Sequence, residues 1–71
     1  MNNVRERLRG LGKTQIWLIM ELRERGLIVQ TSEFSYILSG VLTTPKAKTV
    51  LKECDAILTD YENEVKNDGA S

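Results

Sequence analysis

Apolar residues recur every three or four positions along most of this 71-residue chain, which is the spacing that predicts α-helices. The pattern predicts four helical segments, at roughly 3–11, 15–25, 31–39 and 45–65. No segment alternates apolar and polar residues as a half-buried strand does, although "LIVQT" is compatible with a very short one. We therefore expect an all-α domain of about four helices, the last one long, over residues 1–65. Residues 66–71 are expected to form a polar, disordered C-terminal end.

Residues typical of helix ends support these boundaries. Thr14 can cap the second helix, and Thr44 followed by Pro45 gives the strongest helix start in the chain. Gly26 and Gly40 are placed to end the second and third helices. The cap of the third helix is either Gln30 or Thr31, and the sequence leaves this choice open.

The composition argues against catalysis and against a membrane location. The chain has no histidine and one cysteine, so the usual zinc sites, the commonest general base and an internal disulfide are all missing. Cys54 lies on the apolar stripe of the last helix, where packing is the expected role. The longest apolar run, 16–20, is too short to span a bilayer. We expect a cytoplasmic protein that is not an enzyme, with no cofactor, no metal, no membrane contact and no small-molecule substrate.

Net charge is zero, but the charges are unevenly distributed. Residues 1–52 contain nine Lys or Arg and four Glu, a net charge of +5, whereas residues 53–71 contain one Lys and six Asp or Glu, a net charge of −5. Blocks of opposite sign often mark different surfaces. A basic face and an acidic end are therefore expected, with ordinary solvated helix faces as the alternative.

The stretch "QTSEFSYILSG", residues 30–40, predicts a short helix with one apolar side, formed by Phe34, Ile37 and Leu38. Its other side carries small polar groups suited to hydrogen bonding. With the segment "GKTQIWLIMEL" before it and "VLTTPKAKTVLKECDAIL" after it, the chain resembles the Cro and lambda repressor-like (XRE-type) helix-turn-helix family over about residues 4–58. The resemblance implies a sequence-specific transcriptional regulator of the phage or mobile-element repressor or Cro type, with double-stranded DNA as partner.

In that family the third helix reads base edges in the major groove, which requires exposed hydrogen-bonding side chains near its start. The residues that meet this requirement are Gln30, Thr31, Ser32, Glu33, Ser35 and Tyr36. Two helix starts offer phosphate contacts, from Lys13, Thr14, Gln15, Thr43, Thr44 and Lys46. Ordinary helix capping beside a solvated lysine is the alternative explanation for both sets.

Two further expectations concern protein partners. The apolar stripe of the last helix continues through Leu58, Tyr61 and Val65, past the surface that three short helices are expected to cover, and predicts a homodimer contact. Coverage of this stripe by the first helix and the loops of a monomer is the alternative. A protein-interaction module on the same scaffold, antirepressor or antitoxin-like, is the alternative function; an exposed Trp17 would favour it.

Overall fold

The computed structural model describes the backbone of residues 3–70 and the side chains of residues 3–64. It contains the helices α1 (Val4–Leu11), α2 (Gln15–Glu24), α3 (Thr31–Leu38) and α4 (Pro45–Ala70). No strand occurs in these residues, so the segment "LIVQT" is not one. The expected all-α fold with four helices and a long last helix is confirmed.

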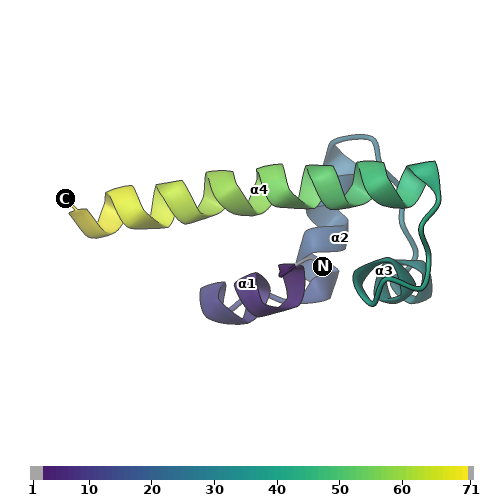
Figure 1. The fold of residues 1–71 in the computed structure, drawn as a ribbon. Coiled ribbons are helices and arrows are strands. Elements are labelled where there is room, and N and C mark those ends of the chain that lie inside the picture. The colour runs from purple at the N-terminus through teal and green to yellow at the C-terminus, as the bar shows by residue number, and fades with distance from the viewer. Residues whose placement is uncertain (1–2, 71) are drawn as a thin grey trace.

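The long helix α4 lies along one side of the molecule, and the three short helices pack against it (Figure 1). Helix α2 also packs against α3, while α1 lies under the middle of α4. The loop before α4 returns the chain from α3 to the start of α4, so α3 lies at the end of the molecule away from the C-terminus. One side of α3 is consequently left open to solvent.

The helix ends form where the sequence places them. The Thr14 hydroxyl accepts a hydrogen bond from the Trp17 amide at 3.1 Å, and the Thr44 hydroxyl accepts one from the Ala47 amide at 3.2 Å. Both bonds satisfy amides that have no partner inside their helix. At the start of α3, Gln30 is the N-cap, and its backbone amide donates to Glu33 Oε1 at 3.4 Å. The cap of this helix is therefore Gln30 and not Thr31.

The apolar stripes of all four helices meet in one core. Leu18, Leu22, Phe34, Val50 and Cys54 are each fully buried there. The core also takes in one residue that we expected at a dimer contact. Leu58 is 0% exposed in its own chain, so the prediction that it contacts a second copy is wrong.

The coverage of Leu58 shows that the short helices reach farther along α4 than their lengths suggested. The other two residues expected at the homodimer contact are Tyr61 and Val65. Tyr61 is half-buried and packs edge-on against Trp17, with ring centroids 5.4 Å apart. The side chain of Val65 lies outside the described residues. The homodimer itself stays a prediction, without Leu58 in its interface.

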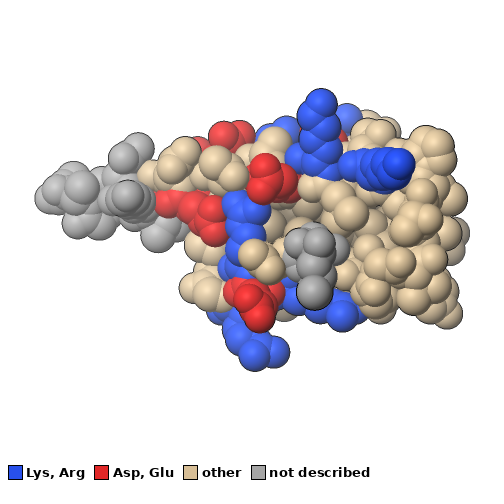
Figure 2. Space-filling view, in the orientation of Figure 1, with Lys and Arg blue, Asp and Glu red and all other residues tan. Residues whose placement is uncertain are grey.

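Ion pairs join the basic and acidic parts of the sequence, contrary to the expectation of separate surfaces. Arg7 of α1 donates to Asp55 at 2.7 Å and to Glu62 at 2.8 Å, both on α4. Arg25 lies 3.3 Å from Glu53 and 3.6 Å from Asp60. Figure 2 accordingly shows blue and red atoms side by side where α1 meets α4. The basic residues that remain unpaired, rather than the whole basic block, are the ones available to a partner.

The backbone of α4 is helical to Ala70. The expected polar end at 66–71 concerns residues whose side chains lie outside the description, and it stays a prediction. Within the described part of the chain, no helix has the length and the apolar character needed to cross a membrane.

Candidate nucleic-acid interface

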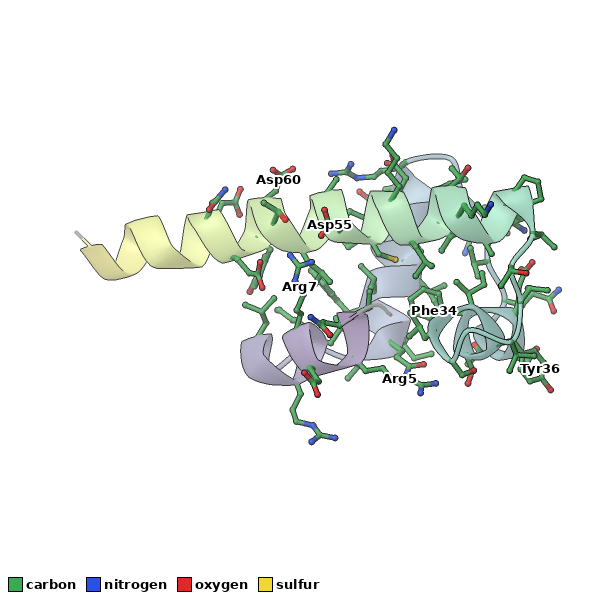
Figure 3. The ribbon with its side chains drawn as sticks, viewed as in Figure 1. Arg5, Arg7, Phe34, Tyr36, Asp55 and Asp60 are labelled. Carbon is green, nitrogen blue, oxygen red and sulfur yellow. The ribbon has the colours of Figure 1, made fainter. Side chains whose placement is uncertain are left out.

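Helix α3 turns its apolar side into the core and its polar side outward. Phe34 and Ile37 are 0% and 1% exposed, whereas Thr31 and Ser32 at the start of the helix are exposed. Tyr36 is 56% exposed and points away from the molecule, opposite to Phe34 (Figure 3). The buried side fixes the rotation of the helix, so the exposed hydroxyl groups form a fixed row on the outer surface.

This row has almost no charge. Helix α3 contains one charged residue, Glu33, and the space-filling view shows mostly uncharged side chains at the end of the molecule where α3 lies (Figure 2). Hydroxyl and phenol groups can donate and accept hydrogen bonds, which suits contacts with base edges or with backbone amides of another protein. This surface therefore offers hydrogen-bonding groups and almost no charge.

Glu33 is held within the chain. Its Oε1 atom accepts the hydrogen bond from the Gln30 amide and lies 3.3 Å from the Lys46 ammonium group at the start of α4. Sequence reasoning assigned Glu33 to base reading and Lys46 to phosphate binding, but the structure brings the two together as an ion pair. The pair joins the first turn of α3 to the first turn of α4.

Ser35 shows a contact that sequence reasoning missed. The Arg5 guanidinium of α1 lies 3.4 Å from both the Ser35 hydroxyl and the Ser35 carbonyl oxygen, and it donates to both. An exposed arginine thus lies beside the polar side of α3. No local pattern could reveal this, because Arg5 and Ser35 are 30 positions apart in the sequence.

The start of α2 keeps its predicted features and gains an aromatic contact. The Lys13 ammonium group lies 5.4 Å from the ring centroid of Trp17 and 5.1 Å from that of Tyr61. Such cation–π contacts leave the hydrogen-bonding capacity of the ammonium group free. Thr14 is exposed but its hydroxyl is occupied as the helix cap, and Gln15 is half-buried. Trp17 is also half-buried, so the exposed tryptophan that would have favoured a protein partner is not found.

The loop before α4 contributes exposed groups near α3. Thr43 and Thr44 are both exposed, but the Thr44 hydroxyl is engaged with the Ala47 amide. Thr43 and the backbone of this loop therefore remain as possible contacts. The loop follows α3 directly, so it lies at the same end of the molecule as α3 (Figure 1).

The described residues show no arrangement suited to metal binding or to a reactive thiol. They contain no cluster of three or more Cys, Asp or Glu side chains able to hold a metal ion. Cys54 is 0% exposed, and burial, with a smaller contribution from the nearby Glu53 carboxylate, raises the pKa of its thiol to about 12. The expected packing role of Cys54 is confirmed.

Comparison with known proteins gives no relative from which a function could be transferred. No family model, no curated protein and no solved structure matches the chain. The resemblance to the Cro and lambda repressor-like family therefore stays a prediction based on the sequence pattern.

Proposed function

We propose that the chain is a sequence-specific DNA-binding regulator of the repressor or Cro type, which reads the major groove with α3. The observation that supports this most is the polar side of α3, a short helix at the end of the molecule, where Thr31, Ser32 and Tyr36 are exposed and Ser35 is half-buried. A helix fits into the major groove of B-DNA, where each base pair shows a distinct pattern of donors and acceptors. The proposal places the chain in the cytoplasm, where the DNA of a phage or mobile element is located.

Thr31 and Ser32 carry the readout in this proposal. They are exposed, lie in the first turn of α3, and have no hydrogen-bond partner for their side chains among the described residues. Ser35 and Tyr36 lie one turn later on the same side. Glu33 serves instead to hold the helix start, because its carboxylate already faces the Gln30 amide and Lys46.

Unpaired cations beside α3 and before the start of α2 support a polyanionic partner. Among the described residues, Arg5 and Lys13 have no carboxylate within salt-bridge distance, although Arg7 and Arg25 each have two. Arg5 lies directly beside Ser35. Affinity for DNA depends on such free cations, because each neutralised phosphate releases counterions.

The test is selection of bound duplexes from a random pool at moderate salt, followed by comparison of two serine variants. Ser32→Ala removes an exposed, unpartnered hydroxyl and should change the preference at one or two base positions, by roughly 1–3 kcal/mol where a good contact is lost. Ser39→Ala is the matched control on the other end of the polar side, because its hydroxyl donates to the Ser35 carbonyl oxygen at 2.7 Å within the chain. If Ser32→Ala and Ser39→Ala enrich the same sequences as the parent, α3 does not read bases.

A protein-interaction module on the same scaffold remains the second candidate, supported by exposed apolar side chains on α2. Ile16 and Met20 are 53% and 61% exposed and lie one helical turn apart. Apolar side chains that line up on an open helix face are typical of contacts with another protein. Failure to enrich any duplex, together with binding of a protein that is lost in Met20→Lys, would favour this candidate over DNA reading.

A further inference from the structure

An open recess of about 350 Å³ lies between α1 and the start of α2. Its lining residues are Arg5, Leu8, Arg9, Lys13 and Gln15. Leu8 is 3% exposed and forms an apolar floor. Arg5 and Arg9 are one turn apart on α1 and therefore face the same way. Three cationic side chains surround the recess, and no carboxylate lines it.

These cations differ from Arg7, which lies between Arg5 and Arg9 in the sequence. Arg7 turns toward α4 and is paired with Asp55 and Glu62. In the described part of the chain, Arg5, Arg9 and Lys13 have no ion pair. Helix α1 thus directs one arginine to the carboxylates of α4 and two toward the recess. Like charges around one hollow repel each other, and a bound anion would remove that repulsion.

The start of α2 adds hydrogen-bond donors to the same region. The Thr14 hydroxyl accepts from the Trp17 amide and the Thr14 carbonyl accepts from the Leu18 amide. The amides of Gln15 and Ile16 have no acceptor among the described residues. Free amides at the start of a helix carry partial positive charge and bind anions. Gln15 lines the recess, and its backbone amide is one of these two free donors.

We propose that this recess holds a phosphate group of the DNA backbone, in the same duplex that α3 reads. The inference rests on the proposed function and adds α1 to it as a phosphate-binding helix. Guanidinium groups bind phosphate oxygens through paired hydrogen bonds, which favours a phosphate over a simple halide ion.

The link between the recess and the reading surface is Arg5. Its guanidinium lines the recess and also donates to Ser35 on α3 at 3.4 Å. A duplex whose groove receives α3 therefore has its backbone next to Arg5, and from there the recess extends along α1 to Arg9. Bases contact α3 and a flanking phosphate contacts α1, which fixes the position of the helix in the groove.

The first measurement is the affinity for a short duplex at several salt concentrations, for the parent and for Arg9→Gln. Loss of one phosphate contact lowers the salt slope by about 0.9, so the affinity ratio of parent to variant should fall about 3.5-fold between 50 and 200 mM salt. Sequence preference should stay unchanged. The matched control is Arg23→Gln, which removes the same charge from the other end of α2. Equal slopes for Arg9→Gln and Arg23→Gln, with Ser32→Ala still changing the sequence preference, would overturn the recess but not the proposed function.

The second measurement does not need DNA. The chain has one tryptophan, and Lys13 lies 5.4 Å from its ring, so an anion at Lys13 should alter Trp17 fluorescence. Titration with inorganic phosphate should give a saturable change in the parent that is weakened in Arg9→Gln and retained in Arg23→Gln. If no duplex binds but this response is found, the recess is an anion site and the DNA proposal fails. If phosphate gives no response and the salt slopes agree, the recess proposal is wrong.

Discussion

Replacing Arg7 with glutamine should remove the ion pairs between α1 and α4 and destabilise the fold. The Arg7 guanidinium donates through Nε and Nη2 to the two carboxylate oxygens of Glu62, at 3.2 and 2.8 Å. It also donates to Asp55 Oδ1 at 2.7 Å and to the Thr59 hydroxyl at 3.0 Å. Glutamine keeps a polar side chain of moderate length but cannot make the paired contact with Glu62.

The size of the expected loss in stability follows from how exposed the paired side chains are. The Arg7 side chain is 23% exposed, whereas those of Asp55 and Glu62 are 71% and 40% exposed, so water screens the Asp55 pair most. Exposed pairs contribute about 0.2–1 kcal/mol each, and paired geometry places the Glu62 contact at the upper end. We expect the free energy of unfolding to fall by about 1–2 kcal/mol. For a domain of this size that lowers Tm by about 4–16 °C.

The assay is urea unfolding at a series of pH values, because the same contact predicts a pH dependence. The hydrogen bond from Arg7 is the main cause that holds the pKa of Glu62 below its usual value. A carboxyl group with a lowered pKa in the folded state adds stability above its unfolded pKa, near 4.5, and this stability is lost as pH falls through the folded pKa. The parent should therefore lose stability below about pH 4.5, and Arg7→Gln should lose less.

The control is Arg9→Gln, which removes the same charge from α1 at an exposed position without a carboxylate partner among the described residues. It should leave the free energy of unfolding within about 0.5 kcal/mol of the parent. Glu62→Gln should reproduce the flatter pH profile of Arg7→Gln. The reasoning is refuted if Arg7→Gln and Arg9→Gln have equal stabilities, or if the acid-induced loss is the same in Arg7→Gln as in the parent.

Three further predictions test the core and one helix end. Leu58→Ala should lower the free energy of unfolding by about 2–5 kcal/mol in urea melts, since the side chain is fully buried; loss of self-association at unchanged stability would restore the dimer contact instead. Cys54 should react with a thiol reagent far more slowly in the native protein than in urea, since its pKa is about 12; rapid native labelling would contradict its burial. Thr44→Ala should cost about 1 kcal/mol and Thr44→Ser much less, and equal losses would show that the hydroxyl does not act as the cap of α4.

Local sequence signals predicted the elements and their ends. Thr14, Thr44 and Pro45 start helices because a hydroxyl that accepts an amide hydrogen bond, and a residue without an amide hydrogen, suit the first turn. Gly26 and Gly40 have φ values of +88° and +82°, which side chains disfavour, and they follow α2 and α3 as expected. The apolar spacing of α3 likewise predicted which of its sides would be buried.

Contacts between distant residues could not be predicted in this way. Arg7 meets Glu62 across 55 positions, and nothing near Arg7 distinguishes it from the exposed Arg5 and Arg9. The prediction for Leu58 was wrong for a similar reason, because its burial depends on how residues from other helices pack in the shared core, which the spacing within α4 does not reveal. The pair between Glu33 and Lys46 was also missed, although each residue was noted separately.

The central claim is that the exposed side of α3 contacts DNA bases, and NMR titration of the isotope-labelled protein with an enriched duplex tests it most directly. We predict the largest changes in amide shifts at Thr31, Ser32 and Ser35, with smaller changes at Gln15 on α2. A duplex altered at the preferred base positions should reduce the changes on α3 while keeping those at Gln15, because phosphate contacts do not depend on sequence. Changes centred on Ile16 and Met20, with none on α3, would contradict the claim.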